Sequence, residues 1–314
     1  MKLRELGEDR LIAELVAGLK TRKGVIVGPG DDCAVVAISG RDELLLLKTD
    51  CVVERVHFQP NDPPAAVGWK AMARALSDFA AMSGVPRFAL VTLVAAADRE
   101  VRWTKDIYRG LQRAADRFDV AIVGGETSGT DGPAMISVSA IGSVEKARWV
   151  SRRGGKAGDA LFVTGRIGGS IRKKHLIFVP RIAEARWLTA NFRVHAMMDL
   201  SDGLGADLPR MAAASGLGFQ IDESALPRNR GSSIAQAISD GEDYELLFAL
   251  PPNDVLSLQK KWRKKFPRLP LTQIGHFHQR STINEQPLPG GYIHFTQRGG
   301  NDRVRPRKSE NAPA

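Results

Sequence analysis

Acidic residues, often beside glycines, recur along the whole chain, and their types are the ones best suited to chemistry. In chain order these groups are Gly30-Asp31-Asp32, Thr49-Asp50, Asp78, Gly124-Gly125-Glu126-Thr127, Asp199-Leu200-Ser201-Asp202-Gly203 and Gly241-Glu242-Asp243-Tyr244. Several carboxylates brought together repel one another and resist ionisation unless cations neutralise them. Magnesium prefers oxygen ligands and is shared between carboxylates and substrate phosphates. The pattern therefore predicts a nucleotide held through magnesium.

Other motifs for phosphate binding or nucleophilic catalysis are absent from the sequence. Gly154-Gly155-Lys156 and Gly165–Ser170 are glycine-rich, but neither fits a G-x-x-x-x-G-K-[ST] loop. The protein-kinase signature set and a G-x-S-x-G elbow are also missing. The six histidines lack metal-binding spacing, and two cysteines, Cys33 and Cys51, are too few for a thiolate cage or a disulfide framework. The candidate chemistry therefore depends on carboxylates.

Each candidate residue also has a purely structural interpretation. The residues Asp199–Gly203 could cap a helix. Capping explains neither Asp50, which follows a run of leucines, nor Asp78 within a helical pattern. Arg152 could be a solvated surface residue, and His57 could be a packed core residue. Taken together, the acidic groups favour a site.

Strands and helices alternate in the pattern expected to position these groups. The expected strands are Leu44–Lys48, Phe88–Val94, Asp119–Val123, Ile136–Ala140, Ala160–Thr164, His195–Asp199, Phe219–Asp222 and Tyr244–Leu250, and the expected helices are Val67–Met82, Val101–Phe118, Pro180–Asn191 and Gly203–Ser215. Open α/β folds build sites where strands end, and glycines there let the backbone approach a ligand. Thr49-Asp50 and Gly124-Gly125 are accordingly expected just after strand ends.

The chain of 314 residues is long for one core, so two domains are predicted. The polar, glycine-bearing stretch Arg148–Asp159 is the best boundary, which gives domains at 1–147 and 148–298. A basic tail, 299–314, is expected to be disordered. The amino terminus has no signal-peptide pattern, and the apolar run Phe88–Ala97 is shorter than the roughly 20 residues that span a bilayer. A cytoplasmic protein with no membrane partner is expected.

The net charge of +10 raises the alternative of nucleic-acid binding. The basic residues occur in clusters near 148–156, 172–174, 260–265 and 303–308, without interleaved aromatic residues or a nucleic-acid-binding signature. A solvated surface is the more ordinary explanation for such clusters. Nucleic acid is therefore not expected as a partner, and a non-catalytic nucleic-acid-binding protein is kept as the alternative from another class.

The order of the motifs resembles the thiamine-monophosphate kinase family, which belongs with aminoimidazole ribonucleotide synthetase in one superfamily. The motifs that carry the resemblance are Gly-Asp-Asp-Cys-Ala at 30–34, Thr49-Asp50 with His57-Phe58, Trp69-Lys70-Ala71, Leu76-Ser77-Asp78-Phe79-Ala80-Ala81-Met82, Gly124-Gly125-Glu126-Thr127, Val163-Thr164-Gly165, Asp199–Leu204, Gly241–Leu246 and Gly291-Tyr292-Ile293-His294-Phe295. The resemblance as a whole covers about residues 5 to 295. The ordered set is specific, although no single motif is decisive.

The resemblance implies an α/β fold of two domains, with mixed sheets flanked by helices, that forms a homodimer through the amino-terminal domain. It implies transfer of a phosphoryl group from ATP to thiamine monophosphate, with several magnesium ions and an open question about K+. Metal ligands would be Asp32, Thr49, Asp50, Asp78, Glu126, Asp199 and Asp202. Contacts with ATP would come from Tyr108, Gly125, Glu126, Arg152 and Ser201, and contacts with thiamine monophosphate from His57, Glu242 and Tyr292. Asp50, Asp78, Asp202 and Arg152 would act in catalysis.

Three features depart from the family pattern. Lys48 stands where a small hydroxyl residue is usual, Glu126 stands where aspartate is usual, and the stretch Ile171–Phe178 is short and basic. The first two could alter a metal site, and the third could alter the wall of the cleft. The nearest alternative is another ATP-using enzyme of the superfamily, a ribotide cyclase or a selenophosphate synthetase. The latter uses a reactive amino-terminal cysteine or selenocysteine with a lysine, which this sequence lacks.

Overall fold

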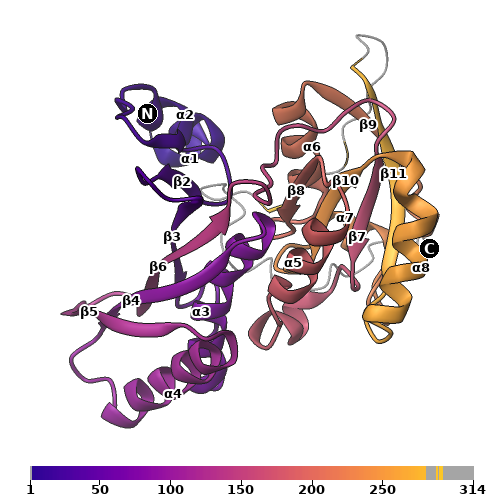
Figure 1. Cartoon of the computed structure of the whole chain (residues 1–314). Coiled ribbons are helices and arrows are strands. Elements are labelled where there is room, and N and C mark those ends of the chain that lie inside the picture. Colours follow the sequence, from indigo (N-terminus) through magenta and orange to yellow (C-terminus); the bar gives the residue numbers. More distant parts are fainter. Residues whose placement is uncertain (1, 281–287, 289, 293–314) are drawn as a thin grey trace, which may run out of the picture.

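The computed structural model describes residues 2–280, 288 and 290–292, and the chain forms two α/β halves that lie side by side (Figure 1). The predicted tail, 299–314, and part of the Gly291–Phe295 motif lie outside the described residues. The predicted two-domain fold is confirmed, and the exact domain limits stay a prediction. Among the described residues, no helix is long and apolar enough to cross a membrane.

The first half is a six-stranded sheet in the order β1-β2-β3-β6-β4-β5. Its elements are α1 (Leu3–Leu6), α2 (Glu8–Ala17), β1 (Val25–Val27), β2 (Ala34–Ala37), β3 (Glu43–Val53), α3 (Pro64–Ala81), β4 (Val85–Ala95), α4 (Val101–Phe118), β5 (Ala121–Gly129) and β6 (Met135–Glu145). The sheet is mixed, because β4 and β5 are parallel whereas the other pairs are antiparallel.

The second half is a five-stranded sheet in the order β8-β10-β7-β11-β9, in which the pairs are antiparallel. Its elements are β7 (Ala160–Thr164), α5 (Ile182–Asn191), β8 (Ala196–Asp199), α6 (Leu204–Ser215), β9 (Leu217–Ile221), α7 (Ile234–Ser239), β10 (Leu246–Leu250), α8 (Val255–Lys265) and β11 (Leu271–Gln279). Short 3-10 turns at Ser170–Arg172 and Lys174–Leu176 lie between β7 and α5.

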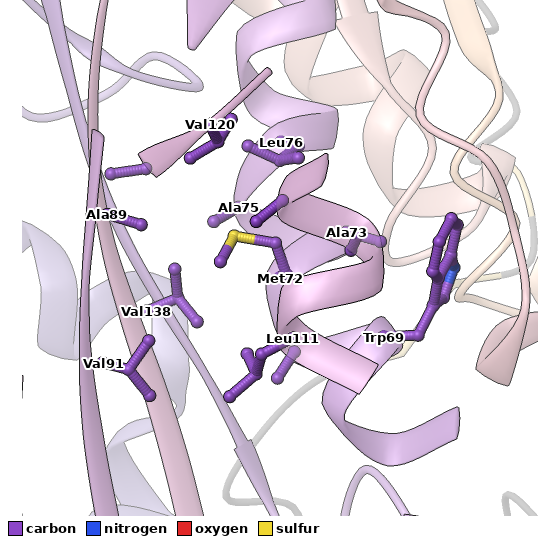
Figure 2. Close-up of a cluster of buried hydrophobic side chains, with 14 of the residues drawn as sticks. Trp69, Met72, Ala73, Ala75, Leu76, Ala89, Val91, Leu111, Val120 and Val138 are labelled. Atoms are coloured by element: carbon purple, nitrogen blue, oxygen red, sulfur yellow. The ribbon is translucent and has the colours of Figure 1, made fainter. Parts of the chain in front are cut away.

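Helix α3 is the central element of the first half, and its apolar residues recur at helical spacing as predicted. Figure 2 shows Met72 and Leu76 of α3 in the cluster that also contains Val91 of β4 and Val138 of β6. The helix also contacts α5 and β8 of the second half. It is therefore buried on nearly every side, including the polar residue Asp78.

The opposite face of the first sheet is not covered by any described helix of this chain. Leu47 pairs with Ile141, which in turn pairs with Phe88, so the three side chains form a row across the sheet. Their exposed fractions are 37%, 38% and 49%. A row of half-exposed apolar side chains on a sheet is an unusual surface for an isolated subunit.

Three predicted strand ends are wrong, and one of them is Ala140, since β6 continues to Glu145. Strand β3 continues through Thr49-Asp50 to Val53, and β5 continues through Gly124-Gly125 to Gly129. The acidic residue of β3 does not end the strand, because an arginine of α3 neutralises it there. In β5, a Cβ at Gly125 would lie 1.8 Å from the carbonyl oxygen of Val91, so glycine permits the close pairing with β4.

The packing of α3 on α4 depends on two glycines. A Cβ on Gly68 would lie 2.0 Å from the carbonyl oxygen of Ile107, and a Cβ on Gly110 would lie 2.0 Å from that of Ala65. Real Cβ atoms cannot approach a backbone so closely, so the helices would have to separate.

We predict that Gly68→Ala lowers the free energy of unfolding by about 1–3 kcal/mol, the usual cost of overpacking a core. Denaturant unfolding measures the change. Gly18→Ala is the matched control, since a Cβ there meets nothing within 4 Å and should have little effect. Equal stability of the two variants would contradict the described helix crossing.

Candidate active site

Three buried carboxylates meet where the two halves of the chain are in contact. Asp32 precedes β2, Asp78 lies in α3, and Asp199 ends β8. One oxygen of each lies within 4.8 Å of one oxygen of each of the others. All three were predicted as metal ligands, and the structure brings them together from distant parts of the chain.

Burial dominates the electrostatics of this cluster. It raises the pKa of Asp32 and Asp78 above the usual range, although Arg152 and Lys48 act in the opposite direction. It raises the pKa of Asp199 to about 7, with Asp32 adding to the effect. A guanidinium nitrogen of Arg152 lies 2.6 Å from Asp32 Oδ1, whereas Asp32 Oδ2 has no hydrogen-bond partner among the described residues. The cluster therefore favours additional positive charge.

Two cationic side chains neutralise the neighbouring carboxylates. Arg74 Nε lies 3.1 Å from Asp50 Oδ2, and Lys48 Nζ lies 2.8 Å from Asp78 Oδ1. Burial alone would favour the neutral amine of Lys48, but Asp78 and Asp50 outweigh it and raise the pKa of the ammonium. Arg74 lies one turn of α3 before Asp78, so its ion pair with Asp50 connects that carboxylate to the site.

A second group of polar residues surrounds Glu242, the predicted acceptor-binding residue. Lys70 is fully buried, and its ammonium donates to Glu242 Oε2 at 2.5 Å and to the carbonyl oxygen of His57 at 2.5 Å. It also lies 2.7 Å from Nδ1 of His175. Because an ammonium only donates, Nδ1 of His175 is the acceptor in this contact. Lys70 therefore joins Glu242 and His57, the two residues predicted to bind thiamine monophosphate. Its contact with His57 is to the backbone carbonyl, whereas the imidazole of His57 accepts a hydrogen bond from the backbone of Val53.

The motif Glu242–Glu245 as a whole holds one segment, 168–181, which we call the strap. The ammonium of Lys70 joins Glu242 to His175. Asp243 accepts hydrogen bonds from Gly168 and Ser170, and Tyr244 stacks on Phe178 with ring centroids 3.9 Å apart. Glu245 binds Arg181 at 2.7 Å and Lys174 at 3.0 Å. Glu242 and Tyr244 have positive φ angles of 65° and 50°. Such strained backbone is characteristic of functional loops.

The outer side of the strap faces a groove instead of the carboxylates. Ile177 and Val179 flank the inward-facing Phe178, and with Trp69, Arg113 and Arg117 they line a space of about 350 Å³. None of these lining residues was a predicted site residue. This groove thus lies outside the cluster of buried carboxylates.

Asp202 and its neighbours lie beside the cluster but form their own contacts. The carboxylate of Asp202 lies 2.6 Å from Arg210. The carbonyl oxygen of Ser201 accepts from the backbone of Glu242 at 2.6 Å, and that of Asp202 accepts from the backbone of Tyr292 at 2.8 Å. This loop therefore connects the predicted nucleotide residues with the predicted acceptor residues.

Glu126 lies on the other face of the first sheet. It pairs with Thr92, which pairs with Ser137, and Ser137 pairs with Cys51. Paired residues share a face and successive residues alternate, so Glu126 lies on the face opposite to Asp50. Its side chain is exposed, and within this chain it does not converge with the three buried carboxylates.

The remaining predicted residues also lie away from the cluster. Thr49 shares the face of Glu126, and its hydroxyl group lies 3.0 Å from that of Ser139. Gly125 lies in β5, and Tyr108 is 36% exposed on α4. Their predicted roles stay predictions.

The sequence interpretation missed Lys70, His175 and the role of Lys48 in the site. A lysine within the apolar helical pattern around Trp69 was a usable signal for Lys70, because a buried ammonium requires acceptors. No local pattern marked His175, since its partner Glu242 is far away in the chain.

Two family models cover most of the chain. Residues 30–144 match the N-terminal domain, and residues 119–280 the C-terminal domain, of AIR synthase related proteins. The thiamine-monophosphate kinase of Rhodopirellula baltica is 35% identical over 313 residues, 91% of this chain and 97% of the relative. That of Aquifex aeolicus is 32% identical over 326 residues, 94% of this chain and 100% of the relative.

Comparison with solved structures gives the same family as these sequence relatives. The structure of AaThiL complexed with AMPPCP and TMP superimposes with a TM-score of 0.80 at 32% identity, covering 94% of this chain and 99% of that chain. Hydrogenase maturation protein HypE in complex with ATP has a TM-score of 0.63 at 18% identity, covers 89% of this chain and 90% of that chain, and shares the fold alone. The chain is therefore a member of the thiamine-monophosphate kinase family.

Proposed function

We propose that this protein transfers the γ-phosphoryl group of ATP to thiamine monophosphate and releases thiamine diphosphate. The observation that carries the proposal is the buried cluster of Asp32, Asp78 and Asp199, formed next to the Glu242 loop. Family membership supports the same reaction, because this chain is similar to thiamine-monophosphate kinases over nearly the whole length of those relatives.

The cluster fits magnesium. Its donors are carboxylate oxygens, which magnesium prefers, and the buried Asp32 Oδ2 has no hydrogen-bond partner among the described residues. Asp32, Asp78 and Asp199 would hold the ions, with Asp50 and Asp202 nearby. Bound magnesium would neutralise the charge of the nucleotide phosphates. The other members of the predicted ligand set, Thr49 and Glu126, would have to act from the uncovered sheet face.

The reaction needs no general base. An oxygen of the acceptor phosphate is already ionised near neutral pH, and it attacks the γ-phosphorus in line. The new P–O bond forms as the bond to the β,γ-bridging oxygen breaks, and its electron pair leaves with ADP. Arg152 lies at the edge of the cluster, where its guanidinium can contact the nucleotide phosphates. Glu242 and the His57 segment hold the acceptor, so positioning supplies most of the rate enhancement.

We also propose that the protein is a homodimer joined through the uncovered face of the first sheet. The row Leu47, Ile141 and Phe88 supplies the apolar surface that a partner would bury. Glu126 lies on this same face, so any role in metal or nucleotide binding would belong to the assembled dimer.

The direct test is a coupled assay for thiamine diphosphate. Purified protein should convert thiamine monophosphate in the presence of ATP and magnesium, and a chelator should abolish the reaction because the carboxylates lose their counter-ions. Folded protein that ignores thiamine monophosphate but turns over a purine ribotide would overturn the proposal in favour of a cyclase-type relative.

Asp199→Asn tests the metal assignment. The amide removes a buried charge but keeps an acceptor for the hydroxyl of Ser77, so we expect a higher Tm without divalent ions. Magnesium should no longer raise the Tm, and activity should fall by at least about a hundredfold. Asp98→Asn, at an exposed position, is the control. An unchanged magnesium response in Asp199→Asn would exclude Asp199 as a ligand.

Phe88→Asp tests the dimer. A carboxylate in the apolar row costs desolvation in the interface, so light scattering at micromolar concentration should give the monomer mass. Leu256→Asp, which replaces an 80% exposed leucine of α8, should leave the dimer intact. A wild-type protein that is monomeric and fully active would refute the dimer.

A further inference from the structure

Lys48 places a cationic group inside the carboxylate site. It lies in β3 two residues before Asp50, so both side chains are on the face that packs against α3. Its side chain is 24% exposed, and Nζ lies 2.8 Å from Asp78 Oδ1. The ammonium therefore occupies space between α3 and the sheet that borders the buried cluster.

A count of charges shows how Lys48 changes the net charge of the site. Five carboxylates occupy the site and its border, and three cationic side chains contact them: the carboxylates are Asp31, Asp32, Asp50, Asp78 and Asp199, and the cations are Lys48, Arg74 and Arg152. With all five carboxylates ionised, as metal binding would require, two negative charges remain, which equals the charge of one divalent ion. Without the lysine, three negative charges would remain.

The two sides of the cluster differ in what they offer to a metal ion. On one side, Asp78 Oδ1 is bound by the ammonium of Lys48, and a divalent ion beside it would be repelled by a like charge a few ångströms away. On the other side, the buried Asp32 Oδ2 has no hydrogen-bond partner among the described residues. A metal ion is therefore favoured near Asp32 and Asp199 and disfavoured beside Lys48.

We propose that the ammonium of Lys48 takes the place of one divalent cation in this site, so that the protein binds one ion fewer than it would without this lysine. The inference rests on the proposed function, in which the cluster binds metal and nucleotide. Lysine is suited to the role, because its ammonium is a compact point charge on a flexible stem.

The test counts bound ions directly. Manganese can replace magnesium as a paramagnetic probe, and electron paramagnetic resonance gives the number of ions bound per chain in the presence of AMPPCP. Lys48→Met keeps an unbranched side chain as far as Cε but removes the charged ammonium group, and it should bind one more manganese ion than the wild type. Without divalent ions its Tm should fall below that of the wild type, and manganese should restore it.

Two further variants make the outcome decisive. Lys48→Arg keeps the charge and should keep the wild-type number of ions, and Lys20→Met, at an exposed position, should do the same. Equal numbers of ions in the wild type and Lys48→Met would overturn this inference alone. So would an additional ion in Lys48→Arg. A wild type that binds no manganese would contradict the proposed metal site itself, and this inference with it.

Discussion

Buried negative charge is the constraint on which the rest of the structure depends. Asp32, Asp78 and Asp199 come from a loop, a helix and a strand end, and they meet only when the two halves of the chain pack together. Removing one partner of a buried ion pair typically costs about 3–5 kcal/mol, so each cation around the cluster contributes to holding it. Arg152 and Lys48 provide those cations from outside the α3 helix. This shortage of positive charge is the property on which the proposed metal binding rests.

The Glu242–Glu245 motif, beside the proposed site for thiamine monophosphate, also carries buried negative charge that needs partners. Its three carboxylates are buried, and each finds its donors in the strap or in α3. Lys70 joins this motif to the segment of His57, so both halves of the chain contribute to the same polar network. In this chain the motif therefore mainly anchors the basic strap, which borders the proposed site for thiamine monophosphate.

The sequence predicted the elements with clear periodicity and the three acidic residues that the structure brings together. Val101–Phe118 and Ala160–Thr164 have the predicted limits, and Asp78, within an apolar helix, lies close to Asp32 and Asp199. The predicted end of β3 was wrong at Asp50, which Arg74 of α3 neutralises. Local sequence does not contain that information. For the same reason, the position of Glu126 on the opposite sheet face follows from strand register and could not be derived from its motif.

The central claim is that the three buried carboxylates bind the metal ions that hold the nucleotide. Crystals grown with manganese and AMPPCP test it most directly, because manganese scatters anomalously and its position can be assigned without assumption. We expect an anomalous peak within about 2.5 Å of carboxylate oxygens of Asp32, Asp78 and Asp199, the range of metal–oxygen bonds. A bound nucleotide with no peak at these three residues would contradict it.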